Sequence, residues 1–358
     1  MTFSTRRLLV LLLAVAPCTA EAQRDPRATP VEPFDSVFAL VRRVPLASTA
    51  EEPVGVVPLL GVTDTRLYVV DGSNGNLKVF DLSNGRLVAT MGRAGDGPGE
   101  LRRLTGMVVD PDGSVSTIDN SRKALVRRDP TGRLIGEVRL QGQWNSLAQV
   151  AVGSKRQLIL TGRSGVLNRE GGIPVQPSTP VLHEVDSSGL GQSSFSVLWP
   201  ESPWQRSFAN YFSSGSGSIL ATAGYSTDVV RFRDWSTNRE WADTLRAAWL
   251  KPITWPKDEQ FGTGTKIQQM NEWVKQQTLV TAVFLGSPRW YVAQVQAFDQ
   301  AGETLWGYIV STTDGRTRRT TAPFARKIQA VNGETAYLLT EDESGNYVLE
   351  VRRIRFTP

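Results

Sequence analysis

The sequence contains only one cysteine and one histidine in 358 residues, and this scarcity excludes two classes of protein. It excludes a scaffold held by several disulfides, and it excludes zinc sites built from several cysteine or histidine ligands. The formal net charge is a modest +5, and the basic residues are not interleaved with aromatic ones, which argues against nucleic-acid binding. Hydrophobic residues make up 40% of the chain, which is typical of a globular protein rather than a disordered or multispan membrane protein.

The first 22 residues have the three parts of a secretory signal peptide. Arg6 and Arg7 form a positively charged start, and Leu8 to Ala16 is an apolar run too short to span a bilayer. Ala20-Glu21-Ala22 then supplies the small-x-small pattern that a signal peptidase reads. We therefore predict cleavage after Ala22, export to the periplasm or the extracellular space, and a mature chain of residues 23–358.

Two other export routes stay open at this point. Cys18 could be the lipidated residue of a lipoprotein, although Pro17 directly before it fits that signal poorly. The paired arginines could mark twin-arginine export, although the strongly apolar stretch after them favours the general secretory route. No later stretch is long and apolar enough to cross a bilayer, so we predict no transmembrane span.

A short phrase recurs along the rest of the chain, consisting of alternating residues, an Asp and often a turn with Gly. Leu77 to Asp81 with Gly85 is one copy, and Ala124 to Asp129 with Gly132 is another. Five aspartates mark such copies: Asp81, Asp129, Asp186, Asp234 and Asp299. Tyr347 to Phe356 reads as a sixth copy that lacks the Asp. A spacing of about 48 to 65 residues fits one four-stranded sheet for each copy.

Within a copy, the strand signals are short, alternating and separated by turn residues. Leu67 to Val70, Asn76 to Phe80 and Arg86 to Met91 are three such strands in the first copy. Asp110 to Gly113 predicts a tight turn, because Pro presets φ and Gly supplies a positive φ. Lys266 to Thr278 is the one convincing helix. Because isolated hairpins are unstable in water, we expect the sheets to stack face to face around an axis.

One part of the chain resembles a known family. Gly92 to Leu101 contains a Gly-x-Gly-Pro-Gly-Glu connector and leads into Gly106 to Gly113, followed by Asp119 and by Val126 to Gly132. Over residues 61–141 this sequence resembles the NHL-type repeat of bacterial six-bladed β-propellers. The resemblance implies an all-β, six-bladed propeller, and it says little about function.

The end of the sequence indicates how the ring closes. The sixth copy offers only three strands, at Lys327 to Val331, Thr335 to Thr340 and Tyr347 to Arg355. Asp35 to Leu46 alternates apolar and polar residues and precedes the first full copy. We predict that this N-terminal strand completes the last blade as its outer strand, which removes an exposed sheet edge. Residues 23–358 would then form a single propeller domain, with the short helix in an inserted segment.

Long connections are expected to gather on one face of such a ring. In propellers of this kind, the connections between second and third strands and between blades emerge on the same face. We assign four long segments to that face: Met91 to Leu104, Gly162 to Thr179, Trp199 to Ser207 and Ser311 to Ala325. Lys251 to Gln277 joins them if Leu279 to Leu285 is an innermost strand, and lies opposite if it is a second strand. Insertions on one face of a repeat protein often mark the binding face.

Aromatic and basic residues in these segments are the candidate partner-binding residues. Tryptophan rings could clamp a peptide or stack on a sugar, and the basic run could contact an anion. The alternatives are structural: the tryptophans could pack between blades, and the basic run could be a solvated loop. The candidates are Trp199, Trp204, Arg316, Arg318 and Arg319.

The leading hypothesis is an exported, non-catalytic and monomeric propeller without a cofactor. It would bind an envelope protein, a peptide or a glycan through its loop-rich face. The alternative is a lactonase or hydrolase with calcium in the central channel, because propellers of that class hold the ion with Glu, Asp and Asn side chains. A third possibility is a structural or assembly role at the cell surface. With His183 as the only histidine and no Gly-x-Ser-x-Gly elbow, a Ser-His-Asp triad is disfavoured.

Overall fold

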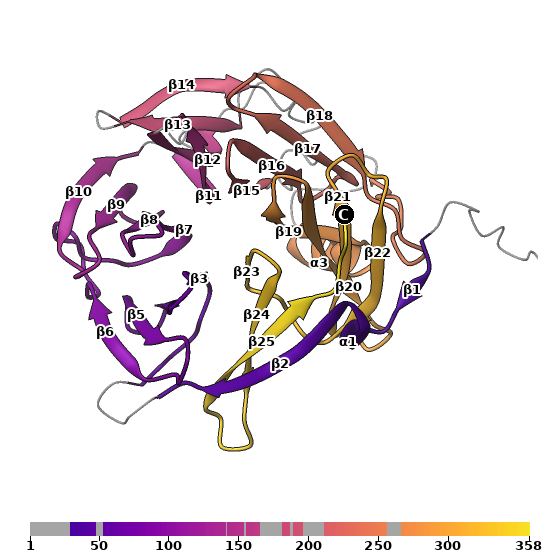
Figure 1. Ribbon diagram of the computed structural model, residues 1–358, viewed down its shortest axis with the longest axis horizontal. Helices are drawn as coiled ribbons and strands as arrows, with labels where there is room; N and C mark the ends of the chain where they lie inside the picture. The colour runs from indigo at the N-terminus through magenta and orange to yellow at the C-terminus, as the bar shows by residue number, and fades with distance from the viewer. Residues whose placement is uncertain are drawn as a thin grey trace, which may run out of the picture.

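Strands in the computed structural model form six sheets arranged as a ring around a central axis (Figure 1). The fold is therefore the predicted six-bladed β-propeller. The structure describes residues 29–47, 53–140, 142–153, 155–164, 181–186, 189–195, 211–255 and 266–358. The predicted signal peptide of residues 1–22 and Cys18 lie outside this set. No helix among the described residues has the length and apolar character needed to cross a membrane.

The first three blades follow one another directly along the chain. Blade I contains β3 (Leu60–Val62), β4 (Arg66–Asp71), β5 (Asn76–Asp81) and β6 (Leu87–Met91). Blade II contains β7 (Leu104–Val109), β8 (Val115–Asp119), β9 (Ala124–Arg128) and β10 (Leu134–Arg139). Blade III contains β11 (Gly142–Val152), β12 (Lys155–Ser164), β13 (Leu182–Asp186) and β14 (Gly189–Phe195).

The last three blades include the N-terminal elements. Blade IV contains β15 (Tyr211–Ser216), β16 (Ile219–Gly224), β17 (Val229–Asp234) and β18 (Arg239–Thr244). Blade V contains β19 (Leu279–Ser287), β20 (Trp290–Phe298), β21 (Thr304–Thr312), β22 (Arg318–Phe324) and β1 (Val31–Glu32). Blade VI contains β23 (Ala330–Asn332), β24 (Thr335–Glu341), β25 (Tyr347–Ile354) and β2 (Phe38–Pro45).

Apolar side chains fill the spaces between blades rather than a single central core. Each of the six main clusters of buried hydrophobic residues combines residues from two neighbouring blades. The second strands are packed on both faces, so every residue of β8 and of β16 is buried. One sheet alone would leave these faces in water, and closing the ring removes them from water in all six gaps.

The N-terminal segment closes the ring across two blades. As predicted, β2 pairs antiparallel with β25 and completes blade VI as its outer strand, with Phe38 opposite Ile354. The structure adds a feature that the sequence did not indicate, because β1 pairs parallel with β22 at the outer edge of blade V. Between them lies the short helix α1 (Phe34–Val37), whose Phe34 and Val37 are buried against both blades.

The predicted helix is present as α3 (Lys266–Lys275), just before β19. Because β19 is the first and innermost strand of blade V, the segment Lys251 to Gln277 connects two blades. Trp273 of α3 stacks on Trp255, with their ring centroids 5.0 Å apart. This stacking ties the helix to the connection that precedes it.

One assignment of the sequence repeat is wrong. The turn at Asp81 joins the third and fourth strands of blade I, but the turn at Asp299 joins the second and third strands of blade V. The turn equivalent to that of Asp81 follows β21 and carries Asp314 and Gly315. An Asp that accepts hydrogen bonds from its own turn stabilises that turn locally. Such an Asp can occur at any hairpin, so it does not indicate which strand of the blade precedes it.

Candidate functional site

The antiparallel order of each blade gives the ring two distinct faces. Connections between the second and third strands and between blades emerge on one face, which we call the connector face. Turns between the first and second strands and between the third and fourth strands emerge on the other, which we call the hairpin face.

The basic candidates lie in blade V on the hairpin side, not on the connector face. The segment Ser311 to Ala325 consists of the end of β21, the turn to the fourth strand, and β22. Its predicted assignment to the loop-rich face is therefore wrong, because the Asp299 turn follows the second strand of this blade and one more hairpin comes before the connection to blade VI. Trp199 and Trp204 lie outside the described residues.

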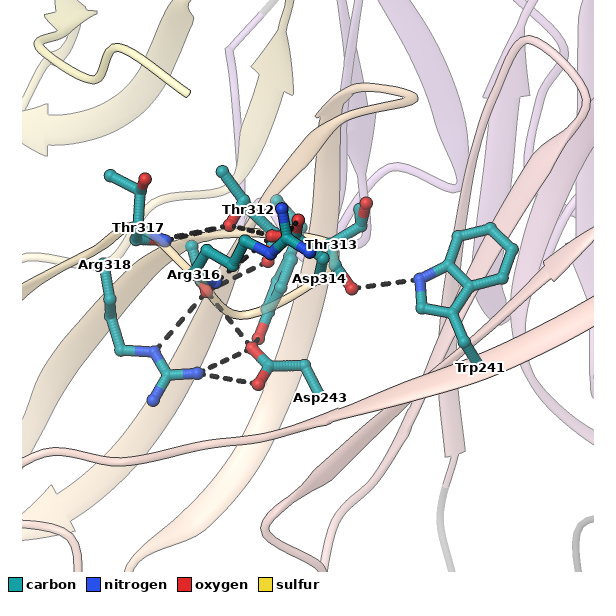
Figure 2. A network of polar contacts seen from close by, with 10 residues as sticks. Trp241, Asp243, Thr312, Thr313, Asp314, Arg316, Thr317 and Arg318 are labelled. Carbon is teal, nitrogen blue, oxygen red and sulfur yellow. Dashed lines mark hydrogen bonds and ion pairs between the residues drawn. The ribbon is translucent and has the colours of Figure 1, made fainter. Parts of the chain in front are cut away.

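Arg318 is buried in a polar network between blades IV and V (Figure 2). Its Nη2 atom lies 2.7 Å from both carboxylate oxygens of Asp243 on β18, and both side chains are less than a tenth exposed. The same carboxylate accepts hydrogen bonds from the Tyr291 hydroxyl at 2.5 Å and the Ser311 hydroxyl at 3.1 Å. Burial and the neighbouring Asp243 carboxylate raise the pKa of Tyr291 well above its usual value.

The other two basic candidates, Arg319 and Arg316, differ in how far their side chains are exposed to solvent. Arg319 forms an ion pair with Glu32 of β1, and the hydrogen bond from Arg319 lowers the pKa of the Glu32 carboxyl. Arg316 is 86% exposed and lies 3.3 Å from Asp314. Of the three arginines, only Arg316 therefore presents its side chain to solvent, and its role in partner binding stays a prediction.

The connector from Gly92 to Leu101 is a folded loop that joins blades I and II on the connector face. The Glu100 carboxylate accepts the Gly97 N–H at 2.7 Å and the Arg93 Nε–H at 2.7 Å. These hydrogen bonds lower the pKa of Glu100. The Glu100 carboxylate therefore stabilises the turn of its own loop. This hydrogen bond requires Gly97 and Glu100 to be three residues apart.

Two buried arginines of blade II hold the backbone of this connector. Arg122 donates to the Glu100 carbonyl at 2.5 Å and to the Glu137 carboxylate at 2.8 Å. Arg128 donates to the Gly99 carbonyl, and Glu137 accepts the Gly99 N–H at 3.0 Å. Burial raises the pKa of Glu137, but the hydrogen bond from Gly99 and the ion pair with Arg122 outweigh burial and lower it.

Two buried aspartates clamp the chain at the ends of second strands, a role that sequence reasoning missed. Asp71 accepts the N–H groups of Ser73, Asn74 and Gly55, so it ties its own turn to the segment that precedes β3. Asp119 does the same in blade II for Arg102 and Arg103 at 2.6 and 3.2 Å. The shared signal is an apolar strand followed directly by Asp, a second residue and Ser.

A pocket opens between these two clamped segments at the seam of blades I and II. It consists of two adjoining cavities with volumes of about 390 and 360 Å³ that share Gly72, Ser73, Gly75 and Arg102. The other residues of the lining come from the two connections and the strand ends, and they are Val56, Pro58, Val70, Asp71, Ala94, Gly95, Leu101, Arg103 and Leu104. The pocket therefore belongs to the connector face.

Glycine keeps the two walls of the pocket close together. Gly75 has a φ of +60°, and a Cβ atom there would lie 2.8 Å from the Cβ of Ala94 and 3.0 Å from the carbonyl oxygen of Leu101. Both the backbone conformation and the close approach therefore require glycine at this position. The connector can approach the turn of blade I only because that side chain is absent.

Two exposed arginines lie at the pocket. Arg102 is 57% exposed and pairs with Asp96, which is 66% exposed, at 2.7 Å. Arg103 is exposed beside it, and its guanidinium has no hydrogen-bond or ion-pair partner among the residues that the structure describes. Asp71 is the one carboxylate in the described lining, and N–H groups already occupy its oxygens.

The innermost strands do not supply the ligand set that the calcium alternative requires. The six strands β3, β7, β11, β15, β19 and β23 contain no Asp, Glu, Lys, Arg or His. Among the described residues, no three His, Cys, Asp or Glu side chains are grouped closely enough to hold a metal. His183 is buried on β13 with its ring edge-on to Trp144, at 5.2 Å between centroids. The inner strands therefore do not fit a calcium ion held by carboxylates.

Comparisons with known proteins agree with the fold. A protein-family model described as a 6-bladed beta-propeller matches residues 30–163. A protein of Bacteroides fragilis described as exported covers 92% of this chain and 98% of its own, at 13% identity and a TM-score of 0.62. A member of the DUF4221 family from Bacteroides vulgatus covers 89% of this chain and 98% of its own, at 11% identity and a TM-score of 0.63.

A protein built from WD40 repeats is also similar in structure. The WD40 repeats of RRP9 cover 89% of this chain and all of their own, at 10% identity and a TM-score of 0.51. No curated protein matches the sequence significantly. At these identities the similarity shows the fold alone, and the NHL-type character of the repeats stays a prediction. By fold, this protein is a six-bladed β-propeller that is similar in structure to an exported Bacteroides protein.

Proposed function

We propose that this protein is an exported, monomeric and non-catalytic propeller that binds a partner through the pocket between blades I and II on its connector face. The observation that carries this proposal is the rigidity of the pocket walls. Asp71 fixes one wall, and Asp119, Arg122 and Arg128 fix the other, so the pocket exists before any ligand arrives. A site that is already ordered loses little conformational entropy on binding.

The positive rim and the exposed apolar rim suit recognition rather than covalent chemistry. Arg102 and Arg103 supply charge, and Val56, which is 68% exposed, supplies an apolar contact. The described lining residues include no His, Cys or Glu, and N–H groups already occupy the oxygens of the one lining carboxylate, Asp71. The export of the chain rests on the residues before Ala22 and on the similarity to an exported propeller.

A pull-down from the envelope fraction of the producing cell tests this proposal. The bait proteins are the native chain, a double variant Arg102→Glu with Arg103→Glu, and the control Arg86→Glu. Arg86 is an exposed arginine at the hairpin face of the same blade, so its reversal makes half the charge change of the double variant without touching the pocket. We expect the double variant to lose the partner and the control to keep it. Equal recovery by the double variant would reject this pocket as the binding site.

A further inference from the structure

We propose that the pocket between blades I and II binds a carboxylate group of a polypeptide, either a chain terminus or an Asp or Glu side chain. This inference rests on the proposed function, because it names the ligand class of the same pocket. It follows from three features of the pocket, which are its exposed arginines, its closed floor and its aliphatic walls.

The first feature is a pair of consecutive arginines whose backbone is fixed and whose side chains are available. Asp119 accepts both of their backbone N–H groups, so the main chain of Arg102 and Arg103 is held in place beside the pocket. An exposed ion pair such as Arg102 with Asp96 contributes little stability, so a ligand carboxylate can replace Asp96. The planar guanidinium matches a carboxylate through two parallel hydrogen bonds.

The second feature is a floor where the two walls meet at glycines. Gly72 and Gly75 lie in the turn between β4 and β5, and Gly95 lies on the opposite wall. A Cβ atom on Gly72 would lie 3.2 Å from the carbonyl oxygen of Val56 and 3.5 Å from Pro58, so protein atoms already occupy the space beside this glycine. The floor is therefore closed by the protein itself, and a ligand would contact the arginines and aliphatic residues around it.

The third feature separates a peptide from a glycan. The apolar part of the lining is aliphatic and comes from Val56, Pro58, Leu101 and Leu104. An aromatic platform, on which the apolar face of a sugar ring would stack, is absent from the described lining residues. Aliphatic walls beside two guanidinium groups instead suit an aliphatic side chain next to a carboxylate.

The test uses synthetic probes and calorimetric titration of the full mature chain. Three pools of acetylated pentapeptides share the same aliphatic sequences. One has a free C-terminal carboxylate, one is amidated and contains a single Glu, and one is amidated and neutral. A trimer of galacturonic acid represents acidic glycans. We expect one or both carboxylate pools to bind at least tenfold more tightly than the neutral pool, and the stronger of the two identifies the carboxylate source.

Two variants show whether the arginines are responsible. The double variant Arg102→Gln with Arg103→Gln should lose at least tenfold in affinity for the carboxylate pool, while Arg86→Gln should bind as the native chain does. All three side chains are exposed, and unchanged circular dichroism would confirm that the variants fold. Equal binding of neutral and carboxylate pools, no binding of any pool, or binding of the uronic-acid trimer alone would each overturn the inference.

The two experiments together distinguish a wrong ligand class from a wrong binding site. If the envelope partner still depends on Arg102 and Arg103 in the pull-down but the pools show no preference for a carboxylate, only the ligand class is wrong. If the partner is recovered equally with the charge-reversed pair, the pocket is not the binding site and both proposals fail.

Discussion

The seam between blades I and II and the seam between blades IV and V both contain buried ion pairs, but these ion pairs have different roles. Each contains a buried arginine paired with a carboxylate of the neighbouring strand or blade. At the later seam, Arg318 and Asp243 lie directly between the blades and join them (Figure 2). At the earlier seam, Arg122 and Arg128 hold connector carbonyls instead, and a pocket remains beside the connector.

This difference separates arginines that support the fold from arginines that are available to a ligand. The side chains of Arg318 and Arg122 are less than a tenth exposed and form ion pairs with carboxylates within the chain. Arg102 and Arg103 have their backbone fixed but their guanidinium groups in solvent. A basic residue is therefore a candidate for binding only when its backbone is held and its head group is free.

The largest effect is expected at the later seam. Asp243→Ala leaves the buried Arg318 without a counter-charge and removes the acceptor of Tyr291, so we expect a loss of about 3–5 kcal/mol in the free energy of unfolding. Urea denaturation measures it, and Arg316→Ala, which changes an exposed arginine of the same hairpin, should alter stability by under about 0.5 kcal/mol. A loss below about 1 kcal/mol in Asp243→Ala would show that this network does not hold the blades together.

A smaller effect is expected at the earlier seam. Arg122→Met keeps the volume but removes the donor to Glu100 and Glu137, and we expect a loss of about 2 kcal/mol. The exposed Arg93, which is 81% accessible, gives the control Arg93→Met, for which we expect at most about 0.5 kcal/mol. If both variants unfold at the same urea concentration, the connector is not held by the buried arginine.

A matched pair of glycines tests the close approach in the pocket wall. Gly75 and Gly153 both have a φ of +60°, but nothing lies within 4 Å of a Cβ built on Gly153. Gly153→Ala therefore measures backbone strain alone, and Gly75→Ala adds the contact with Ala94. We expect Gly75→Ala to be less stable than Gly153→Ala by about 1 kcal/mol in urea denaturation. Equal stability of the two variants would mean that the pocket walls can move apart without cost.

The smallest effect is a pH dependence at the earlier seam. The pKa of Glu137 is lowered in the folded chain, so its contribution to stability is present above the ordinary value of 4.5 and is lost as the pH falls below it. We expect the native chain to lose more stability than Glu137→Gln between about pH 5 and 3, as followed by urea denaturation at each pH. Parallel curves for the two proteins would contradict the paired state of Glu137.

The sequence was sufficient to predict the ring, because alternation and turn residues are local signals that repeat in every blade. Closure by Asp35 to Leu46 could also be predicted, since the sixth copy has only three strands and needs a fourth. The order of the strands around Asp299 in blade V could not be predicted. An Asp turn has the same sequence pattern whether it joins the second and third strands or the third and fourth.

The candidate site was predicted only in part. The Gly92 to Leu101 connector was correctly placed between blades and forms one wall of the pocket, but the segment Ser311 to Ala325 was assigned to the wrong face. The commitment of Arg318 to Asp243 was missed, because these residues are 75 positions apart and meet only after two blades pack. The clamping role of Asp71 was missed for the same reason, since one of its partners, Gly55, lies before the first strand of the blade.

The most direct test of the account is site-specific photo-crosslinking in intact cells, with the crosslinker placed at one of two serines of blade I. Ser73 lies in the turn of the connector face and Ser83 in the turn of the hairpin face, and both are exposed. The account predicts that the chain is joined to a partner from position 73 and not from position 83. Adducts that form from position 83, or equally from both, would contradict binding at the connector face.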